Sequence, residues 1–168
     1  MKGLIAGLGA LVVIGLAFFF YSSPTAPPSS EITEAQIAEI EAEVLDWSDQ
    51  WLEAGTNLDS EGVAALLDQD DGHFVSGAAY RATWAEYLAG SQEVYGSLKE
   101  WGGEWDARRV DILGPGVALL TGQATGPWTL ADGSRFTNRV RFTMVVREIE
   151  GVWKALYGHI SSARTPIQ

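Results

Sequence analysis

The sequence predicts one small α+β domain from residue 31 to the end of the chain, and three observations support this. The chain has 168 residues, 46% of them apolar, which is enough to bury one core. Helix-like spacing of apolar residues occurs between 33 and 102. Strand-like segments separated by turn sequences follow from 104 onward. Helices followed by a four-strand antiparallel meander are typical of helices covering one face of a curved sheet.

The first predicted helix begins at Thr33, which has the spacing of a capping box with Gln36. Apolar residues then recur every three or four positions, on a single stripe that ends near Gly55. The stripe consists of Ile37, Ile40, Val44, Trp47 and Trp51.

Two further helices are predicted, with a short strand at 73–75 between them. Asp59 or Ser60 can cap the short second helix. Thr83 and Glu86 form another capping box, which opens a third helix expected to run to 102–103. Its apolar stripe is Trp84, Tyr87, Leu88, Ser91, Tyr95 and Leu98.

Four strands are predicted at 104–113, 117–130, 135–149 and 152–161, because Gly-containing turn sequences separate these segments. If Glu150-Gly151 is a two-residue turn, Ile149 pairs with Val152 and Phe142 pairs with His159. Side chains alternate between the two faces of a strand, so the last two strands share one buried face. That face carries Asn138, Val140, Phe142, Met144, Val146, Trp153, Ala155, Tyr157 and His159, and the opposite face carries Arg139, Arg141 and Arg147.

The same rule applied to the Asp132-Gly133 turn places Thr121 near Met144 and Gln123 near Phe142. A bulge at 126–127 would reverse this assignment.

The closing stretch from Gly151 to Ser161 opens with Gly-x-Trp and ends with His-x-Ser. Together with the strands at 116–122 and 141–143 and the order of elements, it resembles the SnoaL-like, ketosteroid-isomerase-like branch of the nuclear transport factor 2-like superfamily. The resemblance covers 33–163. It implies a cone-shaped curved antiparallel sheet around the long N-terminal helix and two shorter helices. Members of the superfamily include isomerases, cyclases, dehydratases and non-catalytic binding or dimerising domains.

The resemblance also implies a conical pocket between the bent sheet and the long helix. The residues expected to line it are Trp51, Tyr80, Trp84, Gln123, Asn138, Phe142, Met144, Tyr157 and His159. His159 is the candidate catalytic residue, because an imidazole transfers protons near neutral pH. The alternative is a structural histidine hydrogen-bonded to Ser161 or to the backbone. The catalytic set of the ketosteroid isomerases is not recognisable, since Trp47 and Trp51 stand where a tyrosine donor is expected.

The N-terminus predicts export of the domain. Residues 3–21 carry no charge and are long enough to span a bilayer as a helix, and Lys2 precedes them. We interpret 1–22 as a transmembrane anchor, or a signal segment if it is cleaved, and 23–32 as a Pro/Ser-rich linker. The domain would then lie outside the cytoplasm, in the periplasm or extracellular space, and would be secreted after cleavage. Residues 164–168 are expected to form a tail.

Composition limits the function. The net charge is −11, and 31–71 hold thirteen acids without a Lys or Arg, which disfavours nucleic-acid binding. The chain has no cysteine and two histidines, and we expect neither a metal nor a cofactor. The favoured hypothesis is a membrane-tethered, non-catalytic domain that binds a small apolar molecule or a protein partner. The alternatives are an isomerase, dehydratase or cyclase that uses His159 with Asn138, and a homodimer formed through the arginine-bearing face.

Overall fold

The computed structural model describes residues 32–76, 79–81 and 83–167, and its main feature is a sheet of seven strands. The order along the sheet is β2-β1-β7-β6-β5-β3, and β4 also pairs with β5. The helices are α2 (Glu34–Thr56), α3 (Ser60–Ala65) and α4 (Trp84–Gly96). The strands are β1 (His73–Ser76), β2 (Ala79–Arg81), β3 (Leu98–Trp101), β4 (Glu104–Gly114), β5 (Val117–Leu130), β6 (Arg135–Ile149) and β7 (Val152–Pro166).

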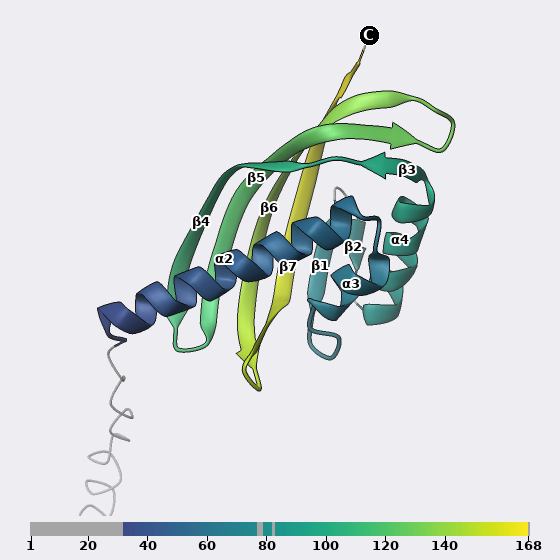
Figure 1. Ribbon diagram of the computed structural model, residues 1–168. Helices are drawn as coiled ribbons and strands as arrows, with labels where there is room; N and C mark the ends of the chain where they lie inside the picture. The colour runs from purple at the N-terminus through teal and green to yellow at the C-terminus, as the bar shows by residue number, and fades with distance from the viewer. Residues whose placement is uncertain (1–31, 77–78, 82, 168) are drawn as a thin grey trace, which may run out of the picture. The chain divides into compact units, whose positions relative to one another are not determined.

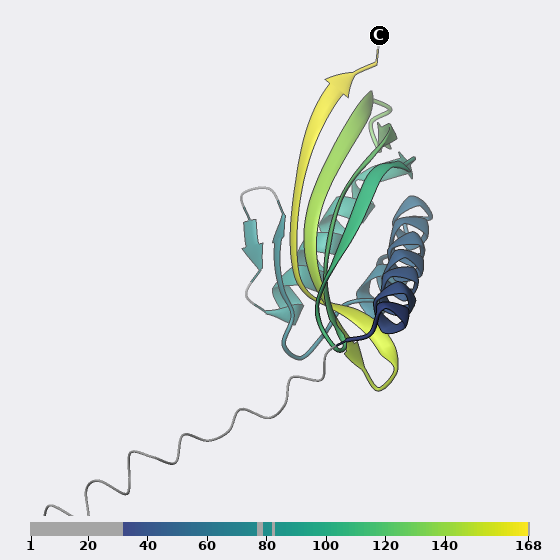
Figure 2. The same cartoon turned by 90° about the vertical axis from the view of Figure 1, so that its left-hand side faces the viewer.

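The long strands curve around α2, which crosses their concave side (Figure 1). The perpendicular view shows that α2 stays on one side of the sheet (Figure 2). β1 runs parallel to β7, and the other pairs of neighbouring strands are antiparallel. The predicted α+β class with a curved sheet is therefore confirmed, and β1 and β2 extend the predicted meander.

The helix α2 begins as predicted, because Thr33 accepts a hydrogen bond from the amide of Gln36 and the Gln36 side chain completes the capping box. Val44, Trp47 and Trp51 of its stripe are buried. Ile37 is 40% exposed, since the first turns of the helix extend beyond the core.

Side-chain hydrogen bonds tie α2 to the strands beneath it. Arg108 of β4 donates to the carbonyl of Leu45, at 3.2 Å, and to the hydroxyl of Ser48, at 2.8 Å. The indole of Trp153 on β7 donates to Glu43 at 2.8 Å. These hydrogen bonds, together with the burial of one face of the helix, fix the position of α2 across the concave side of the sheet.

The third helix is shorter than the sequence predicts. It ends at Gly96 with Ser97 as its C-cap, and Leu98–Trp101 forms β3, which pairs with β5. Leu98 is buried next to Trp128 and Phe136. The helical spacing of Leu98 misled the prediction, because four residues are too few for periodicity to separate a helical turn from a strand.

The last strand is longer than predicted. It continues to Pro166, with its final residues paired along β6, so that residues 164–166 belong to the sheet and not to a tail. The expected anchor at 1–22 and the linker preceding Ile32 lie outside the described residues. Within the described ranges, no helix is both long and apolar enough to cross a membrane.

The register of β6 and β7 changes in the middle of the pair. Ile149 pairs with Val152 as predicted, and the turn residues Glu150 and Gly151 have φ of 53° and 80°, which suits a tight hairpin turn. Between Val146 and Val145 the partner on β7 advances from Ala155 to Tyr157, which leaves one extra residue at 156. A β-bulge of this kind reverses the faces of all later residues on its strand.

The bulge overturns the predicted pairing of Phe142 with His159. Phe142 pairs with Ile160, whereas His159 pairs with the exposed Thr143. Tyr157 and His159 are exposed on the outer face of the sheet. The predicted face holds for the other seven residues, of which Asn138 and Val146 are fully buried.

The hairpin between β5 and β6 differs from the prediction by one residue. The amide of Leu130 donates to the carbonyl of Ser134 across a three-residue loop, in which Gly133 has a φ of 88°. As a result Gln123 pairs with Arg141 and lies on the outer face. The pairing runs through 126–127 without a bulge, so the extra loop residue is the cause of the difference.

Candidate functional site

The concave side of the sheet, α4 and Trp51 of α2 form a cavity of about 310 Å³ that is open to solvent on one side. Aromatic side chains from five elements form much of its wall, and they are Trp51, Phe74, Tyr87, Tyr95, Trp101 and Trp128. The volume is at the lower end of the roughly 300–1,000 Å³ that small-molecule sites occupy.

Contacts between the rings hold this wall in place. Phe74 and Tyr87 lie with centroids 4.7 Å apart, and Trp101 and Trp128 lie 5.0 Å apart. Tyr95 of α4 lies 5.7 Å from Trp101, which connects the helix to the strands. Tilted aromatic pairs at these distances are favourable beyond their burial. These ring contacts therefore connect α4, β1, β3 and β5 along the wall.

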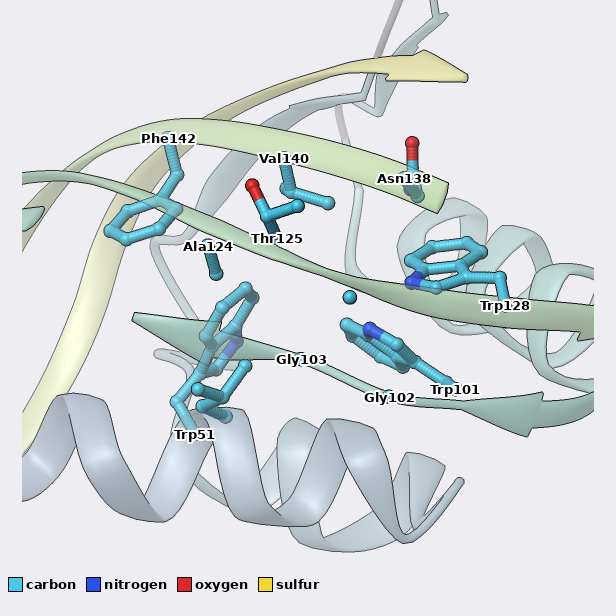
Figure 3. Close-up of a pocket in the computed structure, with 12 residues that line it drawn as sticks. Trp51, Trp101, Gly102, Gly103, Ala124, Thr125, Trp128, Asn138, Val140 and Phe142 are labelled. Carbon is cyan, nitrogen blue, oxygen red and sulfur yellow. The ribbon is translucent and has the colours of Figure 1, made fainter. Parts of the chain in front are cut away.

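A smaller recess of about 10 Å³ shares walls with the cavity at Trp51, Trp101, Trp128 and Val140. Figure 3 shows Trp51 rising from α2 toward β5, with Trp101 and Trp128 on the other side of the recess. A volume of this size holds about one water molecule.

Asn138 lines the recess and is the least explained polar group of the domain. Its side chain is 0% exposed, and neither its amide nitrogen nor its oxygen has a hydrogen-bond partner among the described residues. An unsatisfied buried carboxamide destabilises a fold by about 1–3 kcal/mol. Buried polar groups are nearly always hydrogen-bonded, and a water molecule in the adjoining recess would satisfy this one.

The larger cavity contains few ionisable groups. Burial raises the pKa of Tyr95, and the nearby Tyr87 adds to the rise. Burial also raises the pKa of Tyr87, although a hydrogen bond with Ser91 opposes it. Both phenols are therefore protonated at neutral pH and can donate hydrogen bonds. Among the described lining residues the charged side chains are Arg81 and Arg164.

Three of the predicted pocket residues lie where the sequence places them. Trp51 lines both hollows, and Asn138 and Phe142 line the recess. Met144 is 2% exposed and packs in the core behind these walls. Trp84 stacks on Tyr87 with centroids 5.6 Å apart and thus supports the cavity wall from outside.

Four other predicted residues lie away from both hollows. Tyr80 is 61% exposed on the edge strand β2. Gln123 donates to Asp106 at 2.6 Å on the outer face. Tyr157 and His159 are also on the outer face, because of the bulge at 156. The proposed combination of His159 with Asn138 in a single site is therefore wrong, since their side chains lie on opposite faces of the sheet.

The sequence prediction missed Trp101, Trp128 and the cavity side of α4. Placing 98–101 in the helix hid the position of Trp101, and no face was predicted for Trp128. Tyr87 and Tyr95 were recognised as part of an apolar stripe, yet the stripe alone does not show whether it meets the core or a cavity.

The described residues contain no group of three or more His, Asp and Glu side chains arranged to hold a metal ion.

Long curved strands closed by a helix define a cone-shaped α+β domain, and the comparisons identify its family. The SnoaL-like domain family matches residues 44–165, and the chain belongs to this family. A comparison with curated proteins finds no match.

Solved structures show the same fold at low identity. A ketosteroid isomerase-like protein from Erwinia carotovora atroseptica has 18% identity and a TM-score of 0.69, covering 76% of this chain and 98% of its own. A hexachlorocyclohexane dehydrochlorinase from Novosphingobium barchaimii has 14% identity and a TM-score of 0.67, covering 79% and 92%. An uncharacterised protein with a cystatin-like fold from Caulobacter vibrioides has 18% identity and a TM-score of 0.62, covering 73% and 88%. At these identities the likeness shows the fold alone.

Proposed function

We propose that this domain binds a small apolar molecule in the cavity between α2, α4 and the concave side of the sheet. The observation that carries the proposal is a preformed hollow of about 310 Å³ walled by aromatic rings. It is roughly twice the size of a cavity of about 150 Å³ that admits one benzene ring, so a compact bicyclic or cage-like molecule fits. Such hollows with few polar groups are the usual form of small-molecule sites.

Binding without catalysis is the role that the cavity chemistry favours. The described lining residues contribute neither a carboxylate nor an imidazole, and the two buried phenols have raised pKa values. General acid–base catalysis near neutral pH needs a group that exchanges protons there. The exposed His159 lies on the outer face of the sheet and does not face a molecule in the cavity.

A pair of neighbouring residues on β7 provides a matched test. Ser162 lines the cavity, whereas Ser161 pairs with Arg141 on the outer face. Ser162 is exposed at the cavity mouth, so Ser162→Trp should block entry to the hollow, and Ser161→Trp adds the same side chain on the outer face. We expect 1-adamantanemethanol to bind the full chain and Ser161→Trp equally in isothermal titration calorimetry, with a negative heat-capacity change from apolar burial.

Ser162→Trp should lose this binding while its thermal unfolding remains cooperative. If Ser162→Trp binds the alcohol as well as Ser161→Trp does, the cavity is not the site. If the unaltered chain binds no compact apolar probe, the proposed function is wrong.

We also propose that residues 3–21 hold the domain outside the cytoplasm, on the basis of their uncharged sequence after Lys2. An alkaline phosphatase fused to the C-terminus would be active only if this orientation is correct.

Self-association through the outer sheet face stays a prediction, and Arg139 and Arg141 are exposed there. Sedimentation of charge-reversal variants at these two positions would test it.

A further inference from the structure

The larger cavity carries positive charge in a protein that is strongly acidic. The chain has a net charge of −11. Yet the charged side chains among the described lining residues are two arginines, Arg81 of β2 and Arg164 of β7. No carboxylate among the described residues lines the cavity beside them. The side chains that line the cavity thus carry positive charge, although Asp59 lies close enough behind them to contribute to the raised pKa of Tyr95.

Arg81 is built into the cavity wall by the fold. It pairs with the buried Phe74 across β1 and β2, so its side chain leaves the sheet on the inner face. Its guanidinium lies against Gly90 of α4, where an added Cβ would be 2.9 Å from the guanidinium carbon. The absence of a side chain at Gly90 thus leaves space for the half-buried cation between β2 and α4.

Neither cavity arginine is neutralised by the rest of the described domain. Arg108, Arg109 and Arg147 have carboxylate partners, for example Arg108 with Asp49 at 2.6 Å. The exposed arginines Arg135, Arg139 and Arg141 make no ion pair among the described residues, but they do not line the cavity. The side chains of Arg81 and Arg164 make no ion pair and no hydrogen bond to any residue that the structure describes. The guanidinium of Arg164 lies over the ring of Phe136, 4.8 Å from its centroid. Arg164 is exposed at the mouth of the cavity, whereas Arg81 is half-buried in its wall. Two unpaired cations at these positions favour an anion at the mouth of the cavity.

We infer that the ligand of this cavity is a compact apolar molecule with one anionic head group, selected by the positive charge of Arg81 and Arg164. This inference rests on the proposed function and adds the charge of the ligand. The planar guanidinium binds an oxyanion such as a carboxylate through two parallel hydrogen bonds. The aromatic wall accommodates the apolar body, and the protonated phenols of Tyr87 and Tyr95 are further donors in the same cavity.

Two probes of nearly the same shape test the inference on the full chain. Adamantane-1-carboxylate is ionised at pH 7, and 1-adamantanemethanol is neutral. Neither absorbs near 295 nm, so tryptophan emission can report binding next to Trp51, Trp101 and Trp128, which line the cavity. We expect the carboxylate to bind roughly tenfold more tightly than the alcohol, as one charge-assisted hydrogen-bond pair allows.

Variants that remove the charge of one or both arginines test whether these arginines cause the preference for the carboxylate. Arg81→Gln should remove most of the preference, and Arg81→Gln/Arg164→Gln all of it, so that the ratio of the two affinities approaches one. Arg81→Lys keeps the charge and should retain part of the preference. Arg139→Gln removes an exposed arginine on the outer face and should change nothing. Any binding of the probes outside the cavity should be the same in all variants. A change in the ratio of the two affinities therefore reports on the cavity alone.

The outcomes separate this inference from the proposed function. Equal affinity for the two probes, or a preference that persists in the double variant, overturns the anionic ligand and leaves apolar binding intact. Failure of both probes to bind the unaltered chain contradicts the proposed function itself.

Discussion

At the scale of a single residue, the buried side chain of Asn138 lowers the stability of the fold. Its carboxamide is fully buried and unpaired among the described residues, next to a recess with room for about one water molecule. Thr129 provides a contrast on the neighbouring strand. It is also buried, but its hydroxyl donates to Glu100 at 3.0 Å. The two residues thus differ in whether a buried polar group is satisfied by the fold.

This contrast gives a prediction for stability. Asn138→Leu should raise the free energy of unfolding by about 1–3 kcal/mol, because it removes an unsatisfied polar group at nearly constant volume. Thr129→Val should lower it by about 1 kcal/mol, because it leaves a carboxylate without its donor. Urea denaturation followed by circular dichroism measures both. A loss of stability in Asn138→Leu would show that the carboxamide is satisfied in solution.

At the scale of elements, the close approach of two glycines lets β5 change partners. β5 pairs with β4 up to Thr125 and with β3 from Trp128 onward. At the crossing, a Cβ on Gly126 would lie 2.2 Å from the carbonyl oxygen of Gly102. The amide of Gly102 donates to the carbonyl of Pro127 at 2.7 Å, which closes the gap between the two ladders. This junction also positions Trp101 and Trp128 against each other at the cavity wall.

Gly126→Ala should therefore destabilise the domain by roughly 1–3 kcal/mol, the usual effect of overpacking against backbone atoms. Gly96→Ala is the matched control, because an added Cβ at the end of α4 meets nothing within 4 Å. The control should be neutral or stabilising by about 0.5–1 kcal/mol. Thermal unfolding of the two variants compares them directly. Equal stability of both variants would contradict the tight crossing.

At the scale of the whole molecule, a carboxylate next to the sheet links stability to pH. Asp68 is 3% exposed. Burial alone raises its pKa, but hydrogen bonds from the amides of Asp71 and Asp70, each 3.1 Å long, lower it. The guanidinium of Arg147 contacts the same carboxylate and lowers the pKa further. The net result is a pKa below the usual value of 3.8.

A carboxyl whose pKa is lower in the folded than in the unfolded state stabilises the fold above the unfolded value. The contribution of Asp68 should thus be complete above about pH 4 and disappear as the pH falls through the folded pKa. We expect the melting temperature to decline below pH 4, and the decline to be shallower in Asp68→Asn. Calorimetric scans between pH 2 and 7 measure this. An identical decline in both proteins would exclude Asp68 as its source.

Local sequence patterns determined the start of two helices and the buried face of several elements. The capping box at Thr33 and the N-cap at Thr83 correctly predict where α2 and α4 begin. The apolar stripe of α2 and the alternation along β6 also predict these elements correctly, because neighbouring residues decide them. The resemblance of the last strands to SnoaL-like domains identified the family. The tertiary structure alone decided which side chains meet in the cavity.

The physical reason is that a one-residue error in strand register affects every position further along the strand. One extra residue at 156 and one in the loop at 131–133 each reverse the face of every residue beyond them. These two shifts move His159 and Gln123 to the outer face and bring Ile160, Arg164 and Trp128 into the cavity. Bulges and loop lengths depend on how the sheet curves around α2, which is a property of the folded domain and not of any single segment.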